Sequence, residues 1–294
     1  MLKGKILKGI GGFYYVLDEN KIIHECKAAG RFRKEGVTPL PGDNVIFVPE
    51  GDSYGFIEQI EDRINLLTRP RVANVDMVAI VVSAGKPNID RILCDKLLVS
   101  FIKSNITPLM VINKIDTVDA EQIEGIKLEY EKACNTVCVS AKTGEGLGEL
   151  KMLLQDKCTC FAGQSAAGKS TLLNALFSEL DLETGGMSKK TARGKHTTRH
   201  AELLLPRDFE GTAVDTPGFS FFDNTDLLPE DLYKYYPDIE PYSHACKYPS
   251  CIHTVEPQCS VKDALEQGLI NKSRYDRYVT LLNELKEKRQ RQYD

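Results

Sequence analysis

The sequence predicts an α/β protein in which a small β-barrel precedes a central parallel sheet, and a mostly helical region with a metal site follows it. Three observations predict this order of parts. Short β-type runs broken by Gly, Pro and Asp occupy residues 1–70, and continuous apolar runs alternate with helical stretches in residues 71–222. A Cys/His cluster stands in residues 223–294. We therefore expect three domains with these boundaries.

The composition limits the classes of function. A chain of 294 residues, 42% of them hydrophobic, can bury one core of ordinary size and one or two small ones. The formal net charge of -4 excludes a generally basic nucleic-acid binder, so any such contact must come from local patches. No apolar segment approaches the roughly 20 residues that a membrane span needs, and the N-terminus has no run of secretory type. We expect a cytoplasmic monomer with neither a membrane nor a DNA partner.

The first 70 residues favour a small closed barrel. Their β-type runs include "GGFYYVLD", "NVIFVPE" and "YGFIEQIE", each of which ends at a turn rich in Gly, Pro or Asp. Short strands separated by such turns are typical of small barrels.

The central region favours a parallel sheet. The runs "MVAIVVSA", "PLMVINK", "TVCVSA" and "CTCFAG" are almost continuously apolar, and helical stretches such as "DRILCDKLLVSFIKS" separate them. Strands that are apolar on both faces indicate a parallel sheet covered by helices on both sides.

A phosphate-binding loop follows the last of these strands. The stretch "GQSAAGKST" lies between an apolar strand and the helix opening "TLLNALF". Its glycines let backbone N–H groups turn inward around phosphate oxygens, and the helix N-terminus adds partial positive charge. We expect Lys169 to reach the β- and γ-phosphates and Ser170 to ligate Mg²⁺; a turn without a ligand is the alternative. The loop residues expected to contact the nucleotide are Gly163, Gln164, Ser165, Ala166, Ala167, Gly168, Lys169, Ser170 and Thr171.

Two earlier motifs indicate that the base is guanine. In "VINKID", the Asp116 carboxylate can accept hydrogen bonds from guanine N1–H and from the 2-amino group, a pair of donors that adenine lacks. In GTP-binding proteins of this type, Asn113 braces the loops and Lys114 lies along the base. The tripeptide "SAK" follows the next strand, which places the Ala141 N–H near guanine O6. A surface turn is the alternative. The residues expected here are Asn113, Lys114, Ile115, Asp116, Ser140, Ala141 and Lys142.

A further motif predicts the sensor of the γ-phosphate. In "VDTPGF", we expect Asp215 to hold Mg²⁺ through water and the Gly218 N–H to bond the terminal phosphate. The polar stretch 183–200 is typical of a switch loop that the γ-phosphate orders. Thr198, with Thr197 as the alternative, is expected to complete the Mg²⁺ shell.

The attacking water needs a polar neighbour. Phe219 follows Gly218, where many GTPases carry a glutamine that orients the water, and an apolar side chain cannot hold it. We expect His196 in the switch loop to position the water or to act as the general base. A solvent-exposed histidine in a flexible loop is the alternative.

The order of the motifs is reversed. A conventional GTPase begins with the phosphate loop and ends with the guanine motif and "SAK", whereas those two motifs come first here. Since every motif is present, we expect a circularly permuted GTPase domain, which a parallel sheet tolerates when the natural termini lie close together. The "DTPG" segment then continues directly into the C-terminal region, so that motion at Gly218 can reach that region along the chain.

The C-terminal cluster Cys246-x4-Cys251-x-His253-x5-Cys259 offers three thiolates and one imidazole. We expect it to bind one structural Zn²⁺ with no open position, while packing cysteines and His244 as a competing ligand are the alternatives. The other cysteines are expected in the core: Cys26, Cys94, Cys134, Cys138, Cys158 and Cys160.

Two patterns predict helices after the cluster. Ser260 stands three residues before Asp263, as in a capping box, and so predicts a helix with Ser260 as its N-cap. An apolar stripe at helical spacing predicts a packing surface, formed by Tyr275, Tyr278, Leu282 and Leu285.

The permuted order, together with "GQSAAGKST", "GKHTT", "DTPGF" and "CKYPSCIHTVEPQC", resembles the ribosome small-subunit-dependent GTPase A (RsgA) family. The resemblance spans nearly the whole chain. It implies an N-terminal OB-fold, a permuted P-loop GTPase domain and a C-terminal zinc domain. It also implies hydrolysis of GTP to GDP and phosphate, slow alone and stimulated by the small ribosomal subunit during its late maturation.

The resemblance also concerns single residues. Members of the family use the histidine of the "HTT" phrase in catalysis, which matches His196, and carry an apolar residue where Phe219 stands. Many members continue "HTT" with threonine, whereas Arg199 stands here, so the choice of the Mg²⁺ threonine stays open.

Three functions remain open at this point. The first is a GTPase that docks on rRNA of the small subunit by its barrel and zinc domain. The second is a GTP-dependent regulatory switch that binds protein and touches no RNA, and the third is a zinc-dependent nucleic-acid enzyme with GTP as effector. The candidate RNA contacts, which could also be solvated surface, are Arg31, Arg33 and Lys34 in an expected barrel loop, and Lys286, Lys288, Arg289 and Arg291 in the tail.

Overall fold

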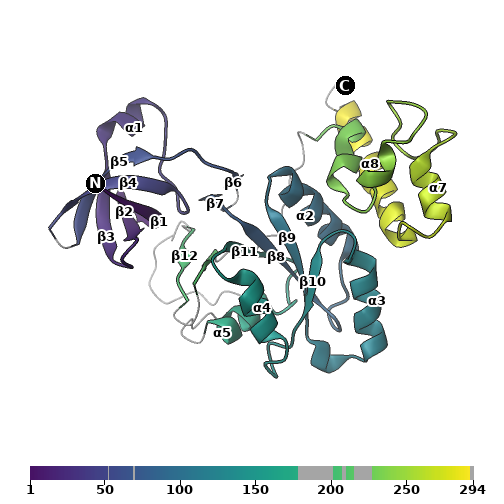
Figure 1. The fold of residues 1–294 in the computed structure, drawn as a ribbon, viewed down its shortest axis with the longest axis horizontal. Coiled ribbons are helices and arrows are strands. Elements are labelled where there is room, and N and C mark those ends of the chain that lie inside the picture. Colours follow the sequence, from purple (N-terminus) through teal and green to yellow (C-terminus); the bar gives the residue numbers. More distant parts are fainter. Residues whose placement is uncertain (52, 69, 178–200, 207–209, 215–226, 292–294) are drawn as a thin grey trace.

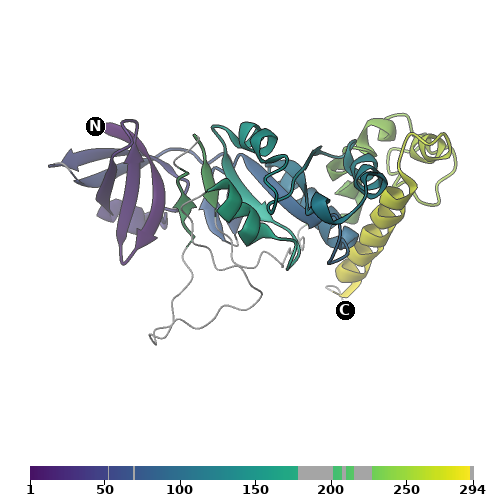
Figure 2. The ribbon, with the colours of Figure 1, turned by 90° about the horizontal axis from the view of Figure 1, so that it is seen from below.

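A computed structural model gives the fold, and it describes residues 1–51, 53–68, 70–177, 201–206, 210–214 and 227–291, with all of their side chains except that of Arg33. Three parts lie in a row (Figures 1 and 2). A β-barrel forms one end, an α/β sheet lies in the middle, and a helical part forms the other end.

The N-terminal part is a closed, OB-like barrel, as predicted. Its sheet closes in the order β1-β2-β3-β5-β4, because β1 pairs with both β2 and β4. Alternate residues such as Ile6, Val16 and Phe47 face the barrel core and are fully buried. The strands are β1 (Leu2–Ile10), β2 (Phe13–Asp18), β3 (Ile23–Ala28), β4 (Asn44–Glu50) and β5 (Tyr54–Ile60).

A short helix replaces the barrel loop that we expected around Arg31. Helix α1 (Gly30–Lys34) joins β3 to β4, and it contains Arg31 and Lys34. The physical reason is Phe32, which the helical turn directs into the barrel core, where only 6% of the residue is exposed. The expectation of a loop was therefore wrong.

A small hairpin connects the barrel to the central sheet. Strands β6 (Leu66–Thr68) and β7 (Arg71–Ala73) pair with each other, and Val72 is fully buried against the core of the next part.

Among the described residues, the central sheet has six strands in the order β10-β9-β8-β11-β13-β12, of which only β12 runs antiparallel to its neighbour. The predicted parallel sheet is confirmed. The three strands that come last in the chain, β11, β13 and β12, lie together on the side of β8 opposite to β9 and β10. The strands are β8 (Met77–Ser83), β9 (Thr107–Asn113), β10 (Asn135–Cys138), β11 (Cys158–Ala162), β12 (Leu203–Leu204) and β13 (Thr212–Val214).

Helices cover both faces of this sheet, which explains the continuously apolar strands. Within β8, Val78 and Ile80 face one hydrophobic cluster and Ala79 and Val81 face the other. Helices α2 (Arg91–Lys103) and α3 (Ala120–Tyr130) pack on the first face, and α4 (Leu147–Leu154) and α5 (Lys169–Leu176) pack on the second. No helix among the described residues is long and apolar enough to cross a membrane.

The C-terminal part is helical and packs against α2 (Figure 1). The predicted stripe is confirmed as packing surface, since Tyr278 and Leu282 are fully buried and Tyr275 and Leu285 are half-buried. The elements of this part are the 3₁₀ helix η2 (Pro229–Tyr235) and the helices α6 (Glu240–Ser243), α7 (Ser260–Glu266) and α8 (Lys272–Arg291). A further 3₁₀ helix, η1 (Ile115–Thr117), belongs to the central part.

Candidate nucleotide site and metal centre

The predicted nucleotide motifs meet at one edge of the sheet. Strand β9 ends at Asn113, β10 ends at Cys138 and β11 ends at Ala162, and all three are parallel. The carboxyl ends of parallel strands point to the same edge whatever the order of the strands in the chain. The guanine motif, "SAK" and the phosphate loop therefore come together despite the permutation.

Two glycines shape the phosphate loop. Gly163 has φ +129° and Gly168 has φ +95°, values that other residues rarely adopt. A Cβ at Gly163 would lie 2.2 Å from the Val81 carbonyl oxygen, and one at Gly168 would lie 2.4 Å from Asn113 Nδ2. The loop thus passes close to β8 and to the guanine motif, which only glycine permits.

The Lys169 ammonium folds back over this loop. It donates to the Gly163 and Gln164 carbonyl oxygens, both at 2.8 Å, and burial lowers the pKa of Lys169. Ser170 and Thr171 follow in the first turn of α5. The cation and the helix N-terminus together form a region suited to phosphate oxygens.

Asn113 ties the three loops together. Its Nδ2 donates to the Ala167 carbonyl at 3.1 Å, and its Oδ1 accepts from the Lys114 and Ala141 N–H groups at 2.8 and 3.1 Å. Only 1% of Asn113 is exposed, so these bonds are shielded from water. The bracing that we expected of Asn113 is present, although the bond from Ala141 was not predicted.

Lys114 and Asp116 follow Asn113 in the same motif. Lys114 Nζ donates to the Lys86 and Ala166 carbonyl oxygens at 2.8 and 2.9 Å, so that its stem extends from the guanine motif to the phosphate loop. The Ser140 hydroxyl donates to Asp116 Oδ1 at 2.7 Å and thereby orients the carboxylate. The tripeptide alone does not indicate this role of Ser140. Ile115 is half-buried and Lys142 is exposed.

Several predicted residues cannot be placed. His196, Thr197 and Thr198 of the expected switch loop lie outside the described residues, and so do Asp215, Gly218 and Phe219. Their roles remain predictions.

A segment without any nucleotide motif borders the site. The Gln164 side chain accepts from the Asp90 N–H at 2.7 Å and donates to the Asn88 carbonyl at 2.8 Å. These partners belong to residues 84–90, which join β8 to α2 and which we call the buttress loop. No motif in its sequence indicates a role for this loop.

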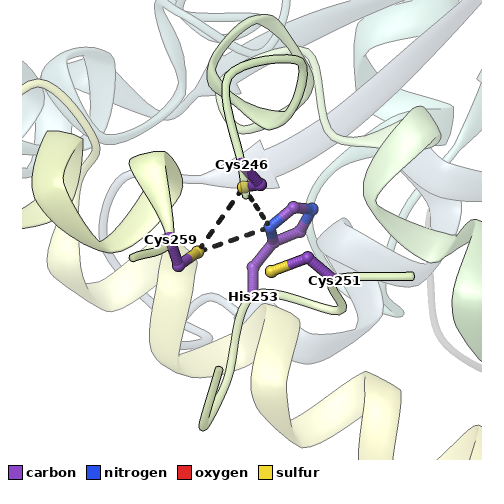
Figure 3. A group of neighbouring side chains, drawn as sticks. All are labelled: Cys246, Cys251, His253 and Cys259. Carbon is purple, nitrogen blue, oxygen red and sulfur yellow. Dashed lines mark hydrogen bonds between the residues drawn. The ribbon is translucent and has the colours of Figure 1, made fainter. Parts of the chain in front are cut away.

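The four residues of the predicted metal site come together in the C-terminal part (Figure 3). Their ligand atoms all lie within 4.8 Å of one another. His253 Nδ1 is 3.5 Å from the sulfurs of both Cys246 and Cys259, and these two sulfurs are 3.8 Å apart. A tetrahedral zinc ion with ordinary bond lengths requires edges of about 3.5 Å between nitrogen and sulfur and about 3.8 Å between sulfurs. The donor set and the three distances among Cys246, His253 and Cys259 therefore fit Zn²⁺.

The structure also decides between the two histidines. His253 is 99% buried, with only 1% of the residue exposed, and burial lowers its pKa, which favours the neutral imidazole that binds metals. His244 is exposed and lies 2.8 Å from Glu240, so it takes no part in the cluster.

Neighbouring residues hold the segment 246–259, which carries the cluster and which we call the metal loop. The Tyr275 and Tyr278 hydroxyls donate to the His253 and Ile252 carbonyl oxygens at 2.6 and 2.9 Å. Burial raises the pKa of Cys246, but hydrogen bonds, above all from Ser260, outweigh burial and lower it below the ordinary value.

The predicted capping box at Ser260 is wrong. Helix α7 has Cys259 as its N-cap, without a side-chain capping bond. The Ser260 hydroxyl instead donates to the Tyr242 carbonyl and lies 3.2 Å from the Cys246 sulfur. The hydroxyl thus supports the metal loop, a long-range role that the local pattern does not show.

Comparison with known families agrees with this geometry. The family model described as RsgA GTPase matches residues 60–225, and the model described as RsgA N-terminal domain matches residues 3–57. A protein of Caldanaerobacter subterraneus subsp. tengcongensis named small ribosomal subunit biogenesis GTPase RsgA is 44% identical over 293 residues, which cover 99% of this chain and 98% of that protein. The protein of the same name from Bacillus subtilis is 41% identical over 300 residues, covering 99% of this chain and all of that protein.

Solved structures show the same architecture. The crystal structure of YjeQ from Thermotoga maritima has a TM-score of 0.86 and 37% identity, and the match covers 97% of this chain and 98% of that one. YloQ, described as a circularly permuted GTPase, has a TM-score of 0.83 and 37% identity, with 98% and 96% of the two chains covered.

Proposed function

The chain belongs to the RsgA GTPase family and is a GTP-hydrolysing enzyme, and we propose that it acts on the small ribosomal subunit, where it hydrolyses GTP to GDP and phosphate during late maturation. The observation that carries the proposal is the match over nearly the full length to relatives named for small-subunit biogenesis. The three loops that Asn113 ties together support the nucleotide part of it.

In this proposal each part of the nucleotide has its own residues. The Asp116 carboxylate, oriented by Ser140, accepts from guanine, and the phosphate loop holds the phosphates with Lys169. Mg²⁺ is held by Ser170, Thr198 and Asp215, and the Gly218 N–H bonds the γ-phosphate. When bound, Mg²⁺ would supply positive charge that stabilises the phosphate oxygens.

The proposed catalytic residue is His196, which positions the attacking water. This role can be separated from nucleotide binding by exchanging His196 for alanine and measuring both turnover on small subunits and GTP affinity. Slower turnover at unchanged affinity supports the role. If both quantities stay the same, another group positions the water.

The two ends of the chain are the proposed contacts with rRNA. We propose an OB-fold domain in residues 1–70, the GTPase domain in residues 71–222 and a zinc domain in residues 223–294, acting as a cytoplasmic monomer. At the barrel, the Arg31 side chain is more than half exposed and pairs with Glu58 at 3.8 Å, and Lys34 is also exposed. In the tail, Arg289 and Arg291 already form ion pairs with Glu230 and Glu287.

The direct experiment measures GTP turnover with and without purified small subunits. We expect marked stimulation by subunits, and a loss of roughly a hundredfold in the Lys169→Ala variant, because that change removes a charge that stabilises the transition state. Sedimentation with subunits under a GTP analogue should weaken as salt rises. Turnover that is indifferent to subunits but stimulated by a protein partner would indicate the regulatory switch instead.

A further inference from the structure

The buttress loop contacts both halves of the nucleotide site. On the side of the guanine motif, Gln122 donates to the Ala84 carbonyl at 2.8 Å and Lys114 donates to the Lys86 carbonyl at 2.8 Å. On the side of the phosphate loop, the Gln164 side chain bonds Asn88 and Asp90. The position of this loop therefore affects both the base-binding and the phosphate-binding segments.

Gln164 faces this loop with both ends of its amide group. Its oxygen accepts from the Asp90 N–H and its nitrogen donates to the Asn88 carbonyl, so the pair of bonds fixes the orientation of the side chain. Since Gln164 is the second residue of the phosphate loop, its backbone moves with the loop. The side chain thus acts as a link between the phosphate loop and the start of α2.

Ion pairs connect the start of α2 to the C-terminal part. Asp90 caps α2 by accepting from the Leu93 N–H at 2.9 Å. The next residue, Arg91, donates from Nε to both Glu129 oxygens at 3.1 and 2.8 Å. On its other side, Glu129 is 2.6 Å from Nη1 of Arg277, which belongs to α8.

Because Glu129 and Arg277 are buried, each of these two charges depends on keeping its partner. The side chains of Glu129 and Arg277 are each 9% exposed, and Arg277 Nε also donates to the buried Asp95 at 2.7 Å. Charges at such sites interact in a low dielectric, and a partner that moves away leaves an uncompensated buried charge. The first turn of α2 is therefore restrained by α8 and in turn restrains Gln164.

We propose that Gln164 and the ion-pair chain behind it, Arg91, Glu129 and Arg277, position the phosphate loop, so that docking of α8 strengthens nucleotide binding. The inference rests on the proposed nucleotide site and adds positioning residues to it. It assigns to the C-terminal part an effect on nucleotide affinity that passes through packed side chains within the described chain.

The test uses purified full-length protein without ribosomes and measures GDP affinity by calorimetry. We expect Gln164→Ala and Arg91→Gln each to weaken affinity about three- to tenfold, since each removes hydrogen bonds that position the phosphate loop. Arg91 is suitable because its side chain is 43% exposed and Glu129 keeps Arg277 as partner. The double variant should lose less than the product of the two single losses, because both changes cut the same chain.

The matched control is Glu284→Gln. It removes the ion pair between Lys96 and Glu284, which joins α2 to α8 at 2.7 Å but lies on the surface and does not involve the start of α2. GDP affinity should stay at the wild-type value. Thermal melts of each variant separate a change in affinity from a loss of fold.

Two results would overturn the inference. One is an Arg91→Gln variant whose affinity equals that of Glu284→Gln, and the other is a double variant in which the two losses multiply. Arg277→Gln extends the test to α8, and if that variant does not fold, Arg91→Gln still decides. Absence of guanine binding by the wild-type protein would instead contradict the proposed nucleotide site.

Discussion

The barrel and the C-terminal part are attached to the central sheet in different ways. The barrel reaches the β12–β13 hairpin through ion pairs of Lys8 with Glu202 and of Lys21 with Glu210, and the second pair is more than 60% exposed on both sides. The C-terminal part reaches α2 through Arg274 and Arg277, which bind Asp95 where no more than 9% of any side chain is exposed.

The space around the two attachments differs as well. A cleft of about 1000 Å³ lies between the barrel and the sheet, lined by Lys5 and Asp18 on one side and by Lys157 and Thr212 on the other. At the opposite end, Val99 of α2 is buried in the same hydrophobic cluster as Tyr236 and Tyr278. The barrel attachment therefore leaves room beside it, although Leu7 of β1 reaches the core of the central sheet, whereas the C-terminal attachment is packed.

Burial, rather than the number of charges, decides how rigid each of the two connections is. Exposed ion pairs contribute little and are screened by salt, whereas a buried pair cannot lose one partner without a large penalty. We therefore expect the C-terminal part to move with α2 and the barrel to adjust its position. The following experiments address this difference.

The largest effect is expected from removing the metal. Structural zinc contributes an apparent free energy of about 10–16 kcal/mol in small modules, so Cys259→Ser or a strong chelator should unfold the C-terminal part while the barrel stays folded. Hydrogen exchange of α7 and of β1–β5 would measure both ends at once.

The control for this experiment is Cys138→Ser, which changes a cysteine outside the cluster. That variant should keep one bound metal ion per chain and the exchange pattern of the wild type. A C-terminal part that stays protected without metal would show that its helices are stable alone, and the comparison would then rest on the buried ion pairs only.

The second effect tests those pairs. Asp95→Ala removes the carboxylate that Arg274 and Arg277 share, and Asp238 then remains for Arg274 alone. Breaking a buried pair costs about 3–5 kcal/mol, so urea unfolding should shift by that amount. Glu284→Ala, at the exposed pair between the same helices, should cost about 1 kcal/mol or less. Equal losses in the two variants would contradict the role of burial.

The sequence was sufficient to predict the features that depend on a hydrophobic pattern or on a short motif. Short β-type runs between turns predicted the barrel, and continuous apolar runs between helical stretches predicted the parallel sheet. The parallel strands placed Asn113, Ala141 and Gly163 at one edge. The spacing of Cys246 to Cys259 predicted the cluster, because four ligands within one loop need little long-range information.

The attachments could not be predicted, because they join distant residues without a local pattern. Arg274 and Asp95 are separated by 179 positions, and the bond from Asp90 to Gln164 spans 74. The same holds for Ser260. Its place in the sequence is typical of a helix cap, but in the fold its hydroxyl donates to the Tyr242 carbonyl. Such contacts depend on how whole elements pack, which residue types alone do not specify.

The third effect concerns the barrel. Raising salt from about 0.1 M to about 1 M shortens the screening length from roughly 10 Å to roughly 3 Å, which should weaken the pairs of Lys8 and Lys21 and let the barrel move. Small-angle scattering should show a larger radius of gyration. Lys8→Glu should give the same expansion at low salt, and adding Glu202→Lys should reverse it. No reversal in the double variant would mean that this pair does not hold the barrel.

The smallest effect is a pH dependence of the same attachment. The hydrogen bond and the charge of Lys21 lower the pKa of Glu210 below its ordinary value of 4.5. A carboxyl whose pKa is lowered by folding stabilises the contact above its unfolded pKa, and this contribution is lost as the pH falls through the folded pKa. We therefore expect the barrel to loosen slightly below pH 4.5, as followed by scattering. Glu210→Gln should reduce this pH dependence, because the amide cannot ionise. If it leaves the dependence unchanged, another acidic group controls the barrel, and the pair with Lys21 lies at the surface without holding the two parts together.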